Sequence, residues 1–106
     1  MFLGEYEHSL DGKGRLTIPV KLRHEFGDGL VVTRGLDGCL FIYTLQGFDA
    51  YVATLNQLPP DKKSSRSFTR FVFSGANKLF PDKQGRILLP APLRIFAGLD
   101  GDVIII

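Results

Sequence analysis

Periodic hydrophobic positions divide the chain into short strands and helices separated by turn residues. Gln46 to Leu58 place apolar side chains at helical spacing and end before two prolines, which predicts an amphipathic helix. Phe68, Phe71 and Val72 form a shorter apolar stripe, which predicts a second connecting helix after a basic, serine-rich linker from Asp61 to Ser67. Strands are expected at residues 2–9, 15–18, 30–33, 39–43, 76–80, 86–89 and 103–106.

Two further helices are expected to be short and to begin at a proline. Pro19 and Pro90 suit the first turn of a helix, because the backbone N–H that proline lacks has no partner there. A glycine follows each helical run, at Gly27 and Gly98, and is expected to end the helix as the C′ residue. The same order of strand, proline, helix and glycine therefore occurs in both halves of the chain.

The two halves are copies of one unit, 71 residues apart. The chain contains Asp11-Gly12-Lys13-Gly14-Arg15-Leu16-Thr17-Ile18-Pro19 and then Asp82-Lys83-Gln84-Gly85-Arg86-Ile87-Leu88-Leu89-Pro90. Units of about 40 residues are rarely stable alone, so the copies are expected to share a core. We expect a first unit at residues 1–47, connecting helices and a basic linker at 48–74, and a second unit at 75–106.

The second unit is expected to be incomplete. It has no equivalent of the strand at 39–43 or of the helix that follows that strand. The apolar strand at 103–106 is therefore expected to leave an unpaired edge. Either a partner chain covers that edge or the chain is shorter than two full units.

Composition indicates an ordered protein of a reducing compartment. The chain has 106 residues, is 44% hydrophobic and contains one cysteine, Cys39, so it cannot form an internal disulfide. Cys39 lies in an apolar strand and is expected to be a buried, inert thiol. Since there is no apolar run of membrane-spanning length and no charged leader, a cytoplasmic protein without membrane contact is expected.

Positive charge is clustered, although the net charge is only +2. Three windows without acidic residues, at 12–24, 62–70 and 83–94, hold 11 of the 13 basic residues. Clustered charge of this kind is typical of a surface that binds a polyanion. The alternative is an ordinary solvated charged face.

The repeated turn carries the chemistry that fits nucleic acid. Arginine and lysine bind phosphates, and arginine reads guanine in the major groove. An aspartate at the start of the turn can hold the arginine that leaves it, because a carboxylate matches the guanidinium group. Aspartate first and glycine fourth is also common in purely structural hairpins, and the second copy with arginine at the same offset favours the functional interpretation. The candidate DNA-binding residues are Asp11, Lys13, Arg15, Lys21, Arg23, Asp82, Lys83, Arg86 and Arg94.

Two of these candidates have an equally good structural interpretation. Arg23 and Arg94 lie on the short helices, where they either contact phosphates or cover the apolar helix face with their stems. The Phe68–Phe73 cluster is assigned to the core or to a subunit interface rather than to base stacking.

Other classes of function find little support in the sequence. A two-carboxylate hydrolase would use Asp11 and Asp82, but such enzymes carry Ser or Thr after the aspartate, where this chain has Gly12 and Lys83. No Ser-His-Asp grouping or P-loop occurs, so no enzyme is expected. His8 and His24 lack partners at metal-ligand spacing, so no metal or cofactor is expected. A scaffold module without nucleic-acid binding stays open.

The paired motifs resemble those of the MraZ family along the whole chain. The resemblance rests on the opening Met-Phe-x-Gly, on both turn motifs, and on Leu-Arg-x-x-Ala-Gly-Leu at 93–99. It implies an α+β fold of two tandem SpoVT-AbrB units in a pseudo-dimeric, swapped-hairpin β-barrel. It also implies a bacterial, nucleoid-associated transcriptional regulator of the division and cell-wall gene cluster, assembled as a ring-like homo-oligomer on promoter DNA with repeated half-sites. Family members bind DNA through Asp-x-x-x-Arg, which corresponds here to Asp11 with Arg15 and Asp82 with Arg86. The chain departs from the family at its C-terminal end, where MraZ proteins continue.

Overall fold

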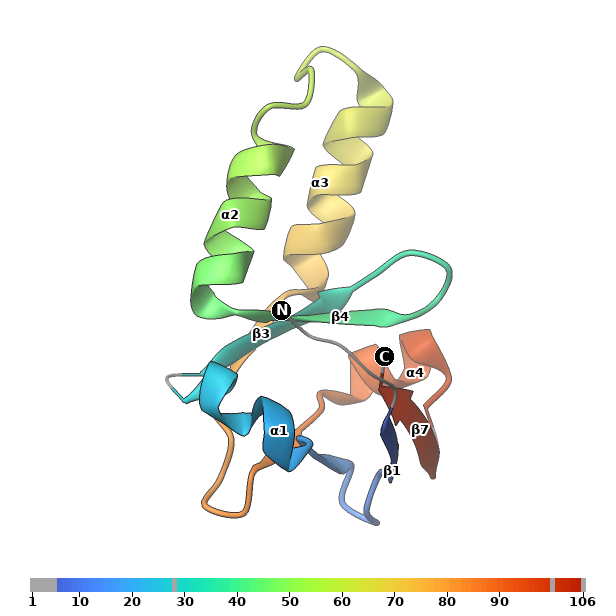
Figure 1. Cartoon of the computed structure of the whole chain (residues 1–106). Coiled ribbons are helices and arrows are strands. Elements are labelled where there is room, and N and C mark those ends of the chain that lie inside the picture. The colour runs from blue at the N-terminus through green and yellow to red at the C-terminus, as the bar shows by residue number, and fades with distance from the viewer. Residues whose placement is uncertain (1–5, 28, 100, 106) are drawn as a thin grey trace.

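A computed structural model describes residues 6–27, 29–99 and 101–105, which form an α+β fold (Figure 1). The strands are β1 (Tyr6–Ser9), β2 (Arg15–Thr17), β3 (Leu30–Arg34), β4 (Leu40–Thr44), β5 (Asn77–Leu79), β6 (Arg86–Leu88) and β7 (Asp102–Ile105). The helices are α1 (Val20–Arg23), the 3-10 turn η1 (His24–Phe26), α2 (Leu45–Leu55), α3 (Lys63–Gly75) and α4 (Ala91–Ala97).

The centre of the fold is a two-stranded ribbon made from the equivalent strands of the two copies. β2 and β6 pair antiparallel, with Leu16 opposite Ile87. Leu16 and Ile87 are equivalent residues of the two copies, so a local twofold axis passes between them and relates the copies. Both side chains are buried, and the ribbon turns this face to the core.

Strands are exchanged between the copies. β1, the first strand of the first copy, pairs with β7 of the second, and β5, the first strand of the second copy, pairs with β3 of the first. The expectation of an unpaired strand is therefore wrong for one edge of β7, which pairs with β1 over four residues, while among the described residues its other edge has no partner strand. Among the described residues the sheets are β1-β7, β2-β6 and β4-β3-β5, so the expected closed barrel is not formed there.

The shared core lies between the ribbon, β3 and the helices that follow each ribbon strand. Equivalent apolar residues of both copies meet in it, as expected from the small size of each unit. The buried cluster consists of Leu16, Ile18, Phe26, Leu30, Val32, Ile87, Leu89 and Leu93.

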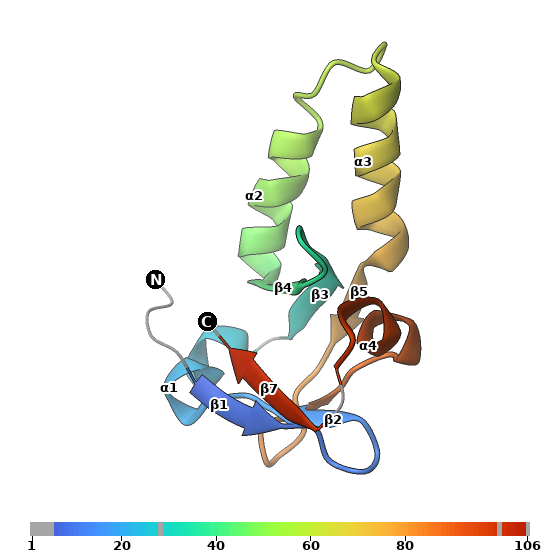
Figure 2. The ribbon, with the colours of Figure 1, turned by 90° about the vertical axis from the view of Figure 1, so that its right-hand side faces the viewer.

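The connecting helices α2 and α3 form a hairpin that rises from the three-stranded sheet (Figures 1 and 2). The Thr33 hydroxyl of β3 donates to the Val72 carbonyl at 2.7 Å, and Arg34 Nε donates to the Phe71 carbonyl at 3.1 Å. The Arg34 guanidinium also lies 4.4 Å from the Phe71 ring centre. These contacts fix the base of α3 on the sheet.

Three local expectations are wrong. The linker predicted at Asp61 to Ser67 is mostly the first turns of α3, whose polar residues extend beyond the sheet and need no apolar face there. Cys39 is exposed, because it lies in the turn before β4, and its Sγ donates to the Leu36 carbonyl at 2.8 Å. Gly27 has a right-handed φ of −54°, since η1 closes the helix with a tighter turn, whereas Gly98 has the left-handed φ of 63°. Within the described ranges, no helix is long and apolar enough to span a membrane.

Candidate nucleic-acid interface

Each ribbon strand is entered through a tight turn that an aspartate closes. In the first turn, Asp11 Oδ1 accepts the backbone N–H groups of Lys13 and Arg15, both at 2.9 Å. Asp11 Oδ2 accepts Arg15 Nε at 2.6 Å. The Gly14 N–H donates to the Asp11 carbonyl at 3.0 Å, and Gly14 has φ = 80°, a conformation that favours glycine.

The second turn repeats this geometry bond for bond. Asp82 Oδ1 accepts the N–H groups of Gln84 and Arg86, both at 2.9 Å, and Asp82 Oδ2 accepts Arg86 Nε at 2.9 Å. Gly85 has φ = 76° and donates to the Asp82 carbonyl at 3.0 Å. The motif therefore specifies one conformation twice.

The hydrogen bonds hold both aspartates in their charged form. The backbone N–H of Arg15 is the main cause that lowers the pKa of Asp11 from 3.8 to about 2, and the Arg15 side chain acts in the same direction. The backbone N–H of Arg86 lowers the pKa of Asp82 in the same way. A hydrolytic carboxylate pair needs one acid with a raised pKa, so this arrangement does not suit one.

The hydrogen bond from each arginine Nε to its aspartate, which we call the brace, fixes the arginine side chain and leaves its terminal nitrogens available. Asp11 and Asp82 engage Nε only, and within the described ranges the terminal nitrogens of Arg15 and Arg86 have no hydrogen-bond partner. Side-chain exposures are 30% for Arg15 and 28% for Arg86. Both guanidinium groups can therefore donate two parallel hydrogen bonds to an acceptor outside the protein.

The two arginines lie on one face of the ribbon. Strand alternation places Leu16 and Ile87 on the buried face and their neighbours on the outer face. In the antiparallel register Arg15 is opposite Leu88, and Thr17 is opposite Arg86. Arg15 and Arg86 are then diagonal neighbours, which in antiparallel pairs lie about 7–8 Å apart, within reach of long side chains.

Each turn is supported by the short helix of the other copy. Arg23 Nε donates to the Ile18 carbonyl at 2.9 Å, and the Arg23 side chain packs against Gly85 so closely that a Cβ there would overlap it. Arg94 Nε donates to the Leu89 carbonyl at 3.1 Å, and its guanidinium lies against Gly14 in the same manner. Both arginines are half-buried. The structure thus gives Arg23 and Arg94 a packing role between the copies.

The structure separates the predicted site residues into two groups. Asp11, Lys13, Arg15, Asp82, Lys83 and Arg86 all lie on the turns or on the ribbon. Lys13, Lys83 and the helix residue Lys21 are exposed. The turns lie at the end of the molecule opposite the α2–α3 hairpin (Figures 1 and 2).

Thr17 and Leu88 share the outer face of the ribbon with the arginines but were not among the candidates predicted from the sequence. Leu88 is 57% exposed, whereas Ile87 beside it is 1% exposed. The signal was present in the motif, since a period of two places residues 15 and 17, and 86 and 88, on one side of their strands.

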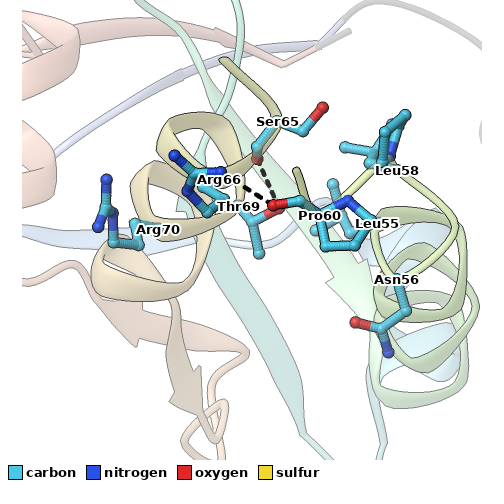
Figure 3. Close-up of a pocket in the computed structure, with 9 residues that line it drawn as sticks. Leu55, Asn56, Leu58, Pro60, Ser65, Arg66, Thr69 and Arg70 are labelled. Atoms are coloured by element: carbon cyan, nitrogen blue, oxygen red, sulfur yellow. Dashed lines mark hydrogen bonds between the residues drawn. The ribbon is translucent and has the colours of Figure 1, made fainter. Parts of the chain in front are cut away.

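The basic window at residues 62–70 belongs to the far end of the molecule. It lies on α3, where Arg66 and Arg70 border a cavity of about 350 Å³ with an apolar wall that includes Leu55 and Leu58 (Figure 3). Arg66 donates to the Pro60 carbonyl, also at the cavity wall, at 3.0 Å. This window and the ribbon therefore lie toward opposite ends of a molecule that is 44 Å long (Figure 1).

Fold and site together define a class of protein in which two interlaced copies of a β-α-β unit present a braced pair of arginines on one ribbon. A family model described as an MraZ protein, antitoxin-like, matches residues 1–71 and 72–106. The chain belongs to the MraZ family, as its motifs indicated.

Relatives match over the full length of the chain. The chain is 52% identical to Transcriptional regulator MraZ of Thermoanaerobacter pseudethanolicus and 54% identical to Transcriptional regulator MraZ of Syntrophomonas wolfei. It is 49% identical to Transcriptional regulator MraZ of Moorella thermoacetica. Each alignment covers 100% of this chain and 74% of the relative.

Proposed function

We propose that the chain is a non-catalytic transcriptional regulator that binds double-stranded DNA through the outer face of the β2–β6 ribbon. The observation that carries the proposal is the pair of aspartate-braced arginines on that one face. The name that its relatives carry, Transcriptional regulator MraZ, supports the same function.

The ribbon has the dimensions for the major groove. That groove is about 12 Å wide and admits a two-stranded β-ribbon. Arg15 and Arg86 would each donate two hydrogen bonds from their terminal nitrogens to O6 and N7 of a guanine. Asp11 and Asp82 hold these side chains in position before DNA arrives, so little rotamer freedom is lost on binding.

The exposed lysines would supply the contacts that do not depend on sequence. Lys13 and Lys83 extend from the turns and Lys21 from α1, where phosphates on both sides of the groove would lie. Arg23 and Arg94 would act indirectly, by keeping the turns in place, because their Nε groups already bind main-chain carbonyls.

One ribbon makes few contacts, so tight binding would require several chains on one promoter. Linked ribbons on repeated half-sites multiply affinity without new chemistry, which fits a ring-like homo-oligomer on DNA of the nucleoid. The division and cell-wall gene cluster is the target that the family resemblance implies. The exchange of β1 and β5 supports a swapped-hairpin arrangement of units at 1–47 and 75–106, joined by 48–74.

The test is DNA binding by Arg15→Ala, Arg86→Ala and the double variant, measured by titration of a promoter duplex. Each single variant is expected to bind about 10- to 100-fold more weakly, because one bidentate base contact is lost. Arg70→Ala, which removes an exposed arginine of α3 far from the ribbon, is the matched control and should bind normally.

The double variant decides between a DNA regulator and a scaffold. It should lose specific binding but remain folded with one cooperative thermal transition, at a melting temperature lowered only by the loss of the two surface bonds to Asp11 and Asp82. If it binds the promoter as tightly as wild type, or if wild-type affinity does not fall steeply with salt, the ribbon is not a DNA-binding surface.

A further inference from the structure

The outer face of the ribbon is symmetric in its arginines and asymmetric at one other position. Thr17 and Leu88 are equivalent in the repeat, and each lies directly opposite the arginine of the other copy. One end of the face therefore pairs arginine with a hydroxyl-bearing side chain, and the other end pairs arginine with an aliphatic one.

Leu88 is not required by the core. Its neighbours Ile87 and Leu89 are each 1% exposed and fill the interior, while Leu88 is 57% exposed. It shares the outer face with charged and polar side chains, and lies opposite Arg15, whose Nε is held by Asp11. An aliphatic group at this point has no hydrogen-bonding capacity, so it can discriminate between ligands only through apolar contact.

The major groove offers one such contact. Thymine carries a C5 methyl group there, and aliphatic side chains recognise it. Cross-strand neighbours have Cβ atoms about 4.5–5.5 Å apart, while successive base pairs are separated by about 3.4 Å. When Arg15 binds a guanine, Leu88 therefore faces an adjacent base pair.

We infer that Leu88 contacts the methyl group of a thymine next to the guanine bound by Arg15, so that the two ends of the ribbon prefer different base pairs. The inference rests on the proposed function and adds a specificity-determining residue to it. Thr17, whose hydroxyl can donate or accept a hydrogen bond, imposes a weaker preference beside Arg86.

The experiment begins with selection of a binding site from random duplexes by the full chain. Each thymine of that site is then replaced in turn by deoxyuridine, which removes the methyl group and keeps every hydrogen bond. Wild type is expected to lose about three- to fivefold in affinity at one thymine next to a guanine, the effect of exposing one methyl group. L88S, which has no methyl group to offer, should bind the thymine duplex more weakly and show no further loss with deoxyuridine.

Three further variants make the result specific. L88M keeps an aliphatic side chain and should keep the deoxyuridine effect. T17L should gain a deoxyuridine effect at the other end of the site. Ile95→Thr changes an apolar residue of α4 that is 79% exposed and should leave the wild-type effect unchanged.

Failure of this inference is distinct from failure of the proposed function. If R15A binds the selected site much more weakly than wild type, but L88S and wild type respond equally to deoxyuridine, the Leu88 contact is wrong and the ribbon remains the DNA-binding surface. A selected site without a thymine beside a guanine also overturns the inference. If wild type binds no duplex, both proposals fall.

Discussion

The two turns of the ribbon agree in every bond that shapes them and differ in what they present outward. In both copies an aspartate accepts two backbone N–H groups and one arginine Nε, and a glycine with positive φ closes the turn. Between aspartate and glycine the first turn has Gly12-Lys13 and the second Lys83-Gln84. Aspartate, glycine and arginine thus form the framework, and the remaining positions are free to set which ligand each copy prefers.

The copies are also mutually dependent. Arg23 of the first copy packs on the turn of the second, and Arg94 of the second packs on the turn of the first. Main-chain bonds follow the same exchange, from Ile18 N to the Gly85 carbonyl at 2.8 Å and from Leu89 N to the Gly14 carbonyl at 3.1 Å. A substitution in one turn should consequently disturb the packing of the short helix of the other copy.

The largest effect on the free energy of unfolding is expected from truncating side chains in the core that the two copies share. Leu16→Ala and Ile87→Ala should each lower the free energy of unfolding by about 2–5 kcal/mol, because both side chains are buried at the centre of the ribbon. Because the copies share this core, denaturant unfolding should remain a single transition in either variant. Two separate transitions, or loss of structure in only one copy, would contradict the comparison. Ile95→Ala, at an exposed site, should change stability by less than about 0.5 kcal/mol.

Alanine variants on the short helices should have the next largest effect, and they should distinguish arginines that stabilise the fold from lysines that bind phosphate. Arg23→Ala and Arg94→Ala are each expected to lower the free energy of unfolding by about 1.5–3 kcal/mol, because each leaves a carbonyl without its charged donor. The slope of log affinity against log salt should stay as in wild type. Lys21→Ala, a matched change on the same helix as Arg23, should show the reverse pattern.

For Lys21→Ala, stability should be unchanged and the salt slope should fall by about 0.9, the value for one lost phosphate contact. Thermal unfolding and a salt titration of DNA affinity measure the two quantities. A reduced slope in Arg23→Ala would show that this arginine contacts phosphate after all.

Local patterns predicted the parts of the fold that a few residues determine. The turn at residues 11–14 and its copy, the strands β3 and β4, and the short helices after Pro19 and Pro90 all depend on neighbours in sequence. The 71-residue repeat further predicted that the two halves are equivalent units with a shared core, which no single motif indicates. The pairing of β1 with β7 was missed because it joins the two ends of the chain, and hydrophobic pattern alone does not say which edges meet.

In the candidate site, too, contacts between residues close in sequence were predictable and contacts between distant residues were not. Asp11 with Arg15, and Asp82 with Arg86, could be paired from spacing because the turn itself brings them together. The role of Arg23 could not, since its contact at Gly85 lies 62 residues away in the chain. Leu88 was missed because it appeared to be one more apolar strand residue until the register showed which face it occupies.

The smallest expected effect is on the pH dependence of the free energy of unfolding, to which the carboxylates of Asp11 and Asp82 both contribute. The folded-state pKa of Asp11 is about 2 against an ordinary value of 3.8, so its contribution to stability is complete above pH 3.8 and is lost as the pH falls toward 2. The pKa of Asp82 is lowered as well, so its contribution has the same sign. Asp11→Asn keeps an acceptor for the turn but removes the charge. Its free energy of unfolding should therefore fall less steeply than that of wild type between pH 4 and pH 2.

The measurement is denaturant unfolding at a series of pH values for wild type, Asp11→Asn, Asp82→Asn and the double variant. The Arg15 Nε to Asp11 Oδ2 distance is 2.6 Å and the equivalent distance in the second copy is 2.9 Å, so Asp11→Asn should flatten the curve at least as much as Asp82→Asn. The double variant should be the flattest, because the two turns bind separate protons. An Asp11→Asn curve that runs parallel to wild type would mean that the charge of the brace does not stabilise the folded chain, and the arginine would then owe its position to the backbone of the turn alone.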